Sequence, residues 1–307
     1  MARKKKGRPV HGWLVLDKPL NMTSTSAVAR TKRLLSAQKA GHAGTLDPLA
    51  TGILPLAFGE ATKTVSYAMD GEKAYQFTVR WGAETETDDA EGQVVQENDR
   101  RPTREDIEAC LVNFRGTIEQ VPPKFSAIKL DGNRAYDLAR EGEAVELQSR
   151  EVEIKQLELV EISDESTAVF SATCGKGTYV RALARDFGRE LGCCGHVIAL
   201  RRTRVGPFDE SSAWTIEKLE QEVEGLESGA EISEVLLPVH ATLAGLPHFS
   251  LTTTDASRLS RGQGVLMRGR DAPIATGAAY ATCKGRLVAL VEIARGELRP
   301  TRVFNLG

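Results

Sequence analysis

The order of hydrophobic and polar side chains predicts strands in several parts of the chain. Between residues 75 and 81, apolar side chains alternate with polar ones, which is the two-residue period of a strand with one buried face. Short apolar runs predict further strands at residues 13–16, 152–162, 167–173 and 287–293. Residues 41–59 contain four glycines and two prolines, so we expect a long loop with short turns there.

Helix signals lie between these strands. Thr23, Ser24 and Thr25 are candidate caps of a helix that runs to about Leu35, and Thr103 with Asp106 has the spacing of a capping box. A third helix is predicted from residue 180 by an apolar stripe, which consists of Val180, Leu183, Ala184, Phe187 and Leu191. Along one flank of that stripe lies a row of basic residues, namely Arg181, Arg185 and Arg189. This row is either aligned for a phosphate backbone or an ordinary solvated face, and the pattern favours neither.

The chain divides into unequal parts. Its 307 residues suggest about two domains, and strands mixed with helices without a regular βαβ repeat indicate an α+β fold. Residues 1–9 form a basic arm, and residues 10–240 form the main domain. Seven glutamates and one lysine at 215–236 indicate a solvated helical face or connector. We expect a separate small β domain at 247–307.

Composition excludes several classes of protein. No apolar run approaches the ~18 residues of a membrane span, and the basic N-terminus lacks a signal-peptide core, so we expect a cytoplasmic protein. The five scattered cysteines form no disulfide framework. Cys193, Cys194 and His196 lack a second ligand pair, so no metal site is expected. The net charge is −2, but residues 174–206 carry seven basic and two acidic side chains, which suits an acidic partner.

One short segment could carry chemistry. In Gly41-His42-Ala43-Gly44-Thr45-Leu46-Asp47-Pro48-Leu49-Ala50-Thr51-Gly52, Asp47 is the only carboxylate, and Pro48 biases it away from helical backbone. The glycines would let another molecule approach the backbone. Such an aspartate suits a nucleophile or a general base. By pattern alone, a turn in which Asp47 simply bonds nearby N–H groups is the better explanation of the segment.

Several blocks together resemble the TruB family of bacterial tRNA pseudouridine-55 synthases. They occur in one order from about residue 11 to 208: Leu16-Asp17-Lys18-Pro19 with Thr23-Ser24, Gly41 to Pro55, Ala74-Tyr75, Val121 to Lys129, Lys176-Gly177-Thr178-Tyr179-Val180-Arg181, and His196 to Arg202. The last 60 residues resemble the PUA RNA-binding module, through Gly262-Gln263 and Leu298 to Phe304. Asn21 and Gly175 depart from the family pattern, and Asn tolerates the left-handed turn expected at position 21.

The resemblance implies a fold and an activity. The fold would be a mixed, mainly antiparallel sheet flanked by helices, with a small barrel-like PUA domain at the C-terminus. The protein would act alone, as a monomer, on the T-loop and T-stem of tRNA, and would convert uridine 55 to pseudouridine without a cofactor. The target nucleotide would be flipped out of its stack, which costs a few kcal/mol.

The resemblance also assigns residues to roles. Asp47 would be the essential carboxylate, which attacks C1′, attacks C6 of the base, or removes a sugar proton. Arg181 would pair with Asp47, Tyr75 would stack on the base, and His42 would lie near the position that the base leaves. Tyr179 and Leu200 would line the pocket, and Lys18 and Pro19 would shape the neighbouring loop. Contacts with the RNA backbone are expected from Arg185, Arg189, Arg201, Arg202 and Arg204.

Two other functions remain open at this point. A non-catalytic tRNA binder or folding chaperone would use the arginine helix and the C-terminal module. A hydrolase that removes the base would share the cleavage of the glycosidic bond. The carboxylate at position 47 argues against a pure binder, because a binder of polyanionic RNA gains nothing from a negative charge.

Overall fold

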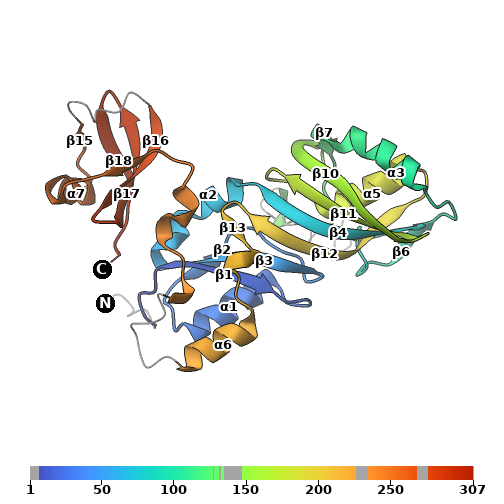
Figure 1. Ribbon diagram of the computed structural model, residues 1–307, viewed down its shortest axis with the longest axis horizontal. Coiled ribbons are helices and arrows are strands. Elements are labelled where there is room, and N and C mark those ends of the chain that lie inside the picture. Colours follow the sequence, from blue (N-terminus) through green and yellow to red (C-terminus); the bar gives the residue numbers. More distant parts are fainter. Residues whose placement is uncertain are drawn as a thin grey trace.

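A computed structural model describes residues 7–126, 128–130, 133–134, 147–225, 234–267 and 276–306. Its larger part is built on a nine-stranded sheet (Figure 1). The strands run in the order β1 (Gly12–Lys18), β3 (Ala50–Phe58), β12 (Gly195–Val205), β4 (Lys73–Trp81), β11 (Thr167–Cys174), β10 (Arg150–Asp164) and β7 (Gly116–Gln120), with β2 (Ala40–His42) beside β3 and β13 (Phe208–Asp209) beside β12. Only the β12–β3 pair is parallel among these described pairings. The sheet is therefore mixed and mainly antiparallel, as expected.

Helices begin where the sequence places their caps. The Thr23 side chain accepts a hydrogen bond from the N–H of Ser26, and Thr103 forms the predicted capping box with Asp106. The helices are α1 (Ser24–Leu34), α2 (Val65–Asp70), α3 (Arg104–Leu111), α5 (Val180–Glu190), α6 (Ile216–Gly225) and α7 (Thr253–Ser260). Short 3-10 helices lie at Gly59–Lys63, Val112–Phe114, Glu210–Ser212 and Val239–Leu243, and short strands at β5 (Ala83–Thr85), β6 (Val94–Glu97), β8 (Lys129–Leu130) and β9 (Asn133–Arg134). None of the helices in the described ranges is both long and apolar enough to cross a membrane.

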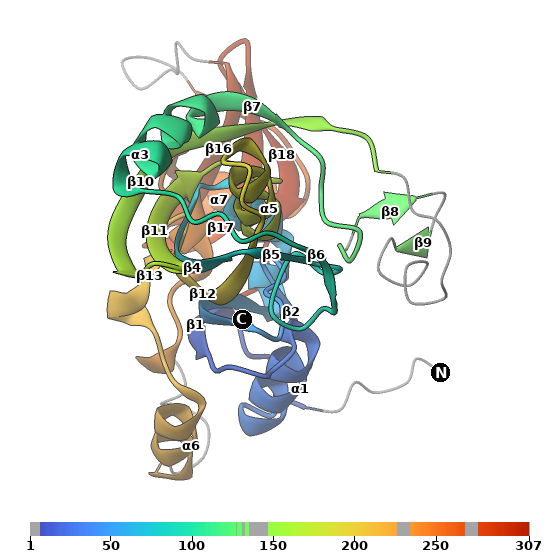
Figure 2. The ribbon, with the colours of Figure 1, turned by 90° about the vertical axis from the view of Figure 1, so that its right-hand side faces the viewer.

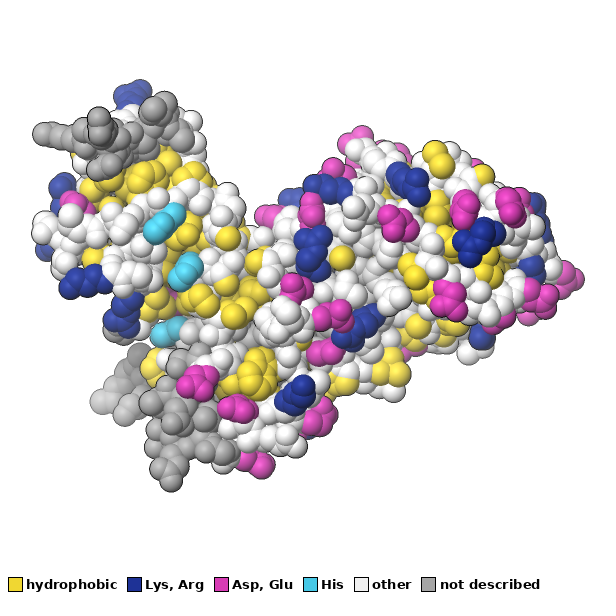
Figure 3. All heavy atoms as spheres, in the orientation of Figure 1, with side chains coloured by type: hydrophobic (Ala, Val, Ile, Leu, Met, Phe, Trp, Pro, Cys, Tyr) yellow, Lys and Arg dark blue, Asp and Glu magenta, His cyan; other side chains and the backbone are white. Residues whose placement is uncertain are grey.

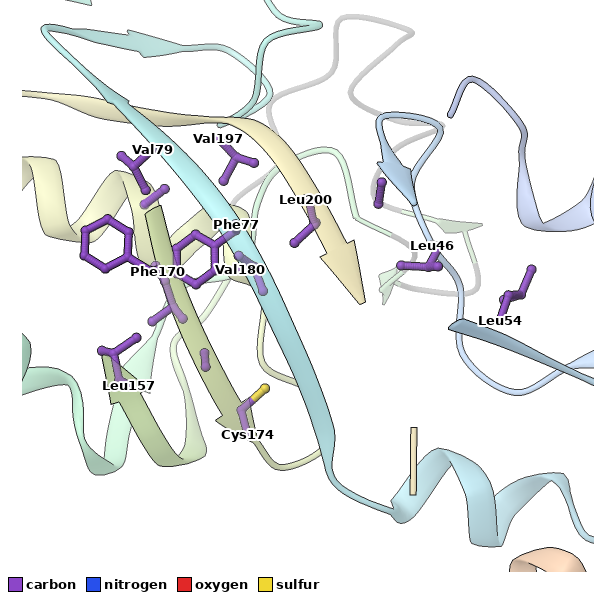
Figure 4. Packing of buried hydrophobic residues seen from close by; sticks show 14 of the residues in the cluster. Leu46, Leu54, Phe77, Val79, Leu157, Phe170, Cys174, Val180, Val197 and Leu200 are labelled. Carbon is purple, nitrogen blue, oxygen red and sulfur yellow. The ribbon is translucent and has the colours of Figure 1, made fainter. Parts of the chain in front are cut away.

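The main core lies between the sheet and α5, with α3 packed beside α5 (Figure 2). The rings of Phe77 in β4 and Phe170 in β11 are stacked with centroids 5.5 Å apart, and Phe170 lies 5.5 Å from Phe187 of α5. Figure 4 shows Phe77 and Phe170 in this layer, with Leu200 of β12 nearby. The apolar stripe predicted for α5 is thus buried, and each phenylalanine contributes about 1.5–3 kcal/mol.

The expectation of a long loop at 41–59 is wrong. Residues 50–58 form β3, a nearly fully buried strand between β1 and β12. Gly52 has φ +98°, and a Cβ atom there would lie 2.2 Å from the carbonyl oxygen of Arg202. The apolar run from Ile53 to Phe58 is buried on both faces, and this burial outweighs the local preferences of glycine and proline for turns. The glycine at 52 therefore accommodates the protein's own β12 strand, and not a ligand.

A second sheet of five strands forms the C-terminal part, at one end of the molecule in Figure 1. Its order is β14 (His248–Ser250), β16 (Gly277–Cys283), β17 (Arg286–Ala294), β18 (Glu297–Val303) and β15 (Val265–Leu266). It has a core of its own, yet Leu287, Leu290 and Phe304 pack in the same apolar cluster as Trp13 and Phe208 of the main part. The predicted α+β fold with a small C-terminal β domain is confirmed, and the two parts share a packed interface.

Candidate active site

The turn that carries Asp47 is anchored from the start of α1. The hydroxyl of buried Ser24 accepts the N–H of Leu46 at 2.8 Å and donates to its carbonyl at 3.0 Å. The N–H of Asn21 donates to Pro48 at 2.9 Å, and Asn21 has φ +61°, which is the left-handed conformation expected there. The first residue of α1 and the turn just before this helix therefore hold the backbone on both sides of Asp47.

Arg181 links Asp47 to a second carboxylate. Its Nη2 atom lies 2.9 Å from Oδ2 of Asp47, and its Nη1 atom lies 3.4 Å from Oδ2 of Asp89. The same guanidinium donates to the carbonyls of Thr87 and Phe125 at 2.9 and 3.0 Å. Arg181 is 5% exposed, whereas the Asp47 side chain is 37% exposed. A buried, fully bonded cation thus fixes the orientation of a carboxylate that solvent can reach.

This carboxylate lines a pocket of about 340 Å³. Most of the residues that were predicted to touch substrate share that lining: Asp47, Tyr75, Tyr179, Arg181 and Leu200. His42 does not line it; this residue ends β2 and lies opposite Leu56 of β3. A cavity of this size has room for one small ligand. Tyr75 is partly buried, and burial raises the pKa of its hydroxyl, so the ring is neutral at physiological pH.

Arg202 supports the pocket from inside the protein. It is 2% exposed, lies opposite Tyr75 in the β12–β4 pair, and donates to the carbonyls of Ile53 and Gly44 at 2.8 and 3.1 Å. A guanidinium enclosed in this way cannot meet an RNA phosphate. The expectation that Arg202 contacts the RNA backbone is therefore corrected, because its position in the middle of the sheet directs it inward.

The arginine row of α5 pairs with the acidic segment around β5. Arg181 faces Asp89, Arg185 Nη1 lies 3.0 Å from Asp88 Oδ2, and Arg189 Nη2 lies 2.8 Å from Glu84 Oε2. The row is divided: Arg181 and Arg185 form buried ion pairs, whereas the side chain of Arg189 is 59% exposed. Arg185 is 7% exposed and also bonds Asp186, so its expected contact with the RNA backbone is corrected too. Burial raises the pKa of Asp88 to about 6, against the opposing effect of Arg185.

Three predicted backbone-contacting arginines remain partly exposed. The side chain of Arg189 is 59% exposed, that of Arg201 34% and that of Arg204 36%. Arg201 is held by both Asp17 and Glu210, at 2.9 and 2.6 Å, and Arg204 lies 3.4 Å from Glu72. On the face of the molecule shown in Figure 3, basic and acidic side chains are interspersed.

Lys18 closes the loop beside the site. Its side chain is fully buried, and Nζ donates to the carbonyls of Pro19 and Met22 at 2.9 and 2.7 Å. Burial lowers the pKa of Lys18 to about 8, while the nearby charge of Asp47 opposes that shift. The expected role of Lys18 in shaping this loop agrees with these contacts.

Sequence reasoning missed two supporting residues. Asp89 carries no signal beyond its place in an acidic, turn-like segment, and Lys73 none beyond the start of an amphipathic strand. Lys73 lines the pocket, is 7% exposed and donates to the carbonyls of Gly71, at 2.6 Å, and Met69. Within the described ranges, no group of three or more His, Cys, Asp or Glu side chains is placed to hold a metal ion.

Solved structures share this fold. The crystal structure of the archaeal box H/ACA sRNP Nop10–Cbf5 complex aligns with a TM-score of 0.72 at 25% identity, and the alignment covers 99% of this chain and 93% of that one. Another, of an H/ACA RNP bound to a substrate RNA containing 2′-deoxyuridine, has a TM-score of 0.73 at 23% identity and covers 99% and 92%. The chain therefore shares its fold, a mixed main sheet followed by a second sheet in the C-terminal part, with these solved structures.

Sequence comparisons give the family of this chain. Residues 32–180 match the TruB family pseudouridylate synthase N-terminal domain, and residues 181–244 match the tRNA pseudouridylate synthase B C-terminal domain. The tRNA pseudouridine synthase B of Rhodopseudomonas palustris is 60% identical over 300 residues, covering 97% of this chain and 82% of that protein. The one of Rhizobium etli is 57% identical over 305 residues, covering 98% of each. The chain belongs to the TruB family of pseudouridylate synthases.

Proposed function

We propose that this pseudouridine synthase acts on uridine 55 in the T-loop of tRNA and uses Asp47 as its essential carboxylate. The observation that carries the proposal is the Asp47–Arg181 pair, in which a buried cation holds an accessible carboxylate in the wall of a pocket of nucleotide size. An accessible carboxylate in the wall of a pocket is typical of a catalytic site, because an ion pair that only stabilises the fold does not require a cavity beside it.

The reaction is an isomerisation, so the substrate and the product have the same atomic composition. The bond from N1 to C1′ breaks, the uracil turns, and a bond from C5 to C1′ forms. The proton on C5 leaves and N1 takes up a proton, so no group donor, cofactor or redox partner is required. Attack of the carboxylate on C1′, attack on C6, and removal of a sugar proton all need Asp47 oriented toward the nucleotide. Arg181 supplies that orientation.

The pocket would receive the nucleotide after it is flipped out of the T-loop. Tyr75 would stack on the uracil, and Leu200 and Tyr179 would enclose it. Stacking of a base on an aromatic side chain contributes about 1–3 kcal/mol, which offsets the few kcal/mol lost on unstacking. His42, at the end of β2, would lie near the vacated place in the RNA.

The remaining RNA would contact the surface around this pocket. We assign backbone contacts to the three partly exposed arginines, Arg189, Arg201 and Arg204. In this proposal residues 10–240 form the catalytic domain, residues 247–307 form a PUA-like RNA-binding domain, and the enzyme acts as a monomer in the cytoplasm. Residues 1–9 are the basic arm in this proposal, and residues 1–6 of it lie outside the described residues.

The test uses an unmodified tRNA transcript labelled with tritium at C5 of uracil. Formation of the C5–C1′ bond releases one tritium per converted uridine, and a transcript with cytidine at position 55 should release none. No release from the uridine transcript would reject the proposal, and free uracil among the products would instead indicate a base-removing hydrolase. A tRNA folding role can coexist with catalysis, but it does not account for a carboxylate held in the pocket by Arg181.

A further inference from the structure

One solvent-exposed ion pair lies at the pocket, and none of the roles above uses it. Nζ of Lys176 lies 2.9 Å from Oδ1 of Asp70, with side-chain exposures of 69% and 59%. Asp70 ends α2, and Lys176 belongs to the loop between β11 and α5. Both residues line the same pocket as Asp47. The pair therefore connects two walls of the pocket at a point that solvent reaches.

The other cations that line the pocket are buried and already form hydrogen bonds or ion pairs within the protein. Arg181 and Arg202 are 5% and 2% exposed and bonded to carboxylates or backbone carbonyls, and Lys73 is 7% exposed and donates to two carbonyls. Among the described residues of the lining, Lys176 is thus the one cation that an entering polyanion can reach. A nucleotide whose base enters this pocket carries a phosphate on each side, so a phosphate must pass close to the mouth.

We propose that RNA displaces Asp70 from Lys176, and that Lys176 then binds a phosphate next to the flipped uridine. In the free enzyme Asp70 occupies the place of that phosphate. This inference rests on the proposed function, because it takes the ligand of the pocket to be a nucleotide within an RNA chain.

The energetics favour such an exchange. An exposed ion pair contributes little to stability, so breaking it costs little. A lysine–phosphate contact also releases counterions from the RNA, which favours binding at low salt. The backbone that follows Lys176 is uncrowded: a Cβ atom on Gly177, which has φ +87°, would meet no heavy atom within 4 Å. The same loop continues into Tyr179 and Arg181, so a phosphate held there is positioned relative to Asp47.

The test measures binding of a T-arm stem-loop RNA across a range of salt concentrations. It uses the full chain carrying Asp47→Asn, so that turnover does not disturb the equilibrium. Lys176→Gln should weaken binding by roughly 3- to 10-fold and lower the salt slope by about one. Asp70→Asn should strengthen binding by roughly 2- to 5-fold and make the slope steeper, because Lys176 is then free to meet the phosphate. Lys176→Arg should bind like the parent protein.

A double variant distinguishes the displacement of Asp70 from Lys176 from a simple repulsion between Asp70 and the RNA. In a Lys176→Gln background, Asp70→Asn should add nothing if Asp70 acts only by pairing with Lys176. An equal gain in both backgrounds, or a Lys176→Gln protein with unchanged affinity and slope, would overturn the inference. Arg104→Gln breaks another exposed pair, with Glu108 on α3, and should change neither quantity. Tritium release by the enzyme with Asp47 intact tests the proposed function separately, since it does not depend on the outcome for Lys176.

Discussion

The Nη2 atom of Arg181 lies 2.9 Å from the Oδ2 atom of Asp47, although the two residues belong to distant parts of the chain. Arg181 is anchored independently of Asp47, by Asp89 and by the carbonyls of Thr87 and Phe125. The position of the guanidinium is therefore set by the fold, and the carboxylate adopts the orientation that the guanidinium imposes. Substitutions of Asp47 and of Arg181 should therefore have different effects.

Asp47→Asn should abolish tritium release while RNA binding is retained. The amide has nearly the same shape but cannot act as a nucleophile or a base, so we expect a loss of at least about 10³-fold in rate. Affinity for tRNA should stay within a few-fold, as measured by filter binding. Asp47 is partly exposed, so the protein should remain folded. A variant that fails to fold would make Asp47 a structural residue.

Arg181→Lys should slow catalysis without a matching loss of binding. Lysine has one ammonium and cannot hold Asp47 and Asp89 in the geometry of a planar guanidinium. We expect the single-turnover rate at saturating RNA to fall by at least about tenfold, with the Kd for tRNA within about threefold. Arg104→Lys, at an exposed position of α3 where the arginine pairs with Glu108, is the control and should retain the full rate. Equal rates for both variants would remove the positioning role of Arg181.

Two substitutions of Tyr75 distinguish a role of its ring in stacking from a role of its hydroxyl group in the chemistry. Tyr75→Phe keeps the ring and should retain much of kcat/KM, whereas Tyr75→Ala loses a stacking surface that contributes about 1–3 kcal/mol, or roughly 5- to 150-fold. Tritium release at subsaturating tRNA measures both. If the two variants have the same activity, Tyr75 does not stack on the base.

Arg185 and Arg189 should differ in their contributions to stability. Arg185→Gln leaves Asp88 without its buried partner, and breaking such a pair costs about 3–5 kcal/mol of unfolding free energy. Arg189→Gln also leaves a buried carboxylate, Glu84, but the side chain of Arg189 is 59% exposed and water can take its place, so the loss should be smaller than for Arg185→Gln. Urea denaturation of the two variants measures the difference. A stable Arg185→Gln protein with a reduced salt slope for RNA binding would instead return this residue to the RNA interface.

The lowered pKa of Lys18 predicts the direction in which the stability of the folded protein changes with pH. Its pKa falls from 10.5 in the unfolded chain to about 8 in the folded protein, because burial disfavours the charged form. Between these values the unfolded state binds more protons, so this residue stabilises the folded state increasingly as the pH rises from 8 to 10.5. Lys18→Met should remove that contribution. The difference in unfolding free energy between the parent protein and this variant should therefore shift in favour of the parent over that range. A difference that stays constant with pH would show that Lys18 has an ordinary pKa.

Local patterns in the sequence were sufficient for much of the fold. The alternation at residues 75–81 gave strand β4, and the caps at Thr23 and Thr103 gave the starts of α1 and α3. The apolar stripe of α5 was buried as predicted. These features depend on side chains within a few residues of one another, so their physical basis is complete in the local sequence. The same patterns failed at β3, because burial between two distant strands outweighs the glycine and proline content of that segment.

The sequence by itself determined that Asp47 lies in a rigid turn bounded by glycines, and that Arg181, Arg185 and Arg189 share one flank of a helix. It did not determine what those arginines face. Only the tertiary structure places the acidic segment around Asp88 against that flank, which buries Arg185 and leaves Arg189 near the solvent. The reason is physical: the effect of a charge depends on its distance to other charges and on its exposure to water. Both quantities are set when segments remote in sequence pack together.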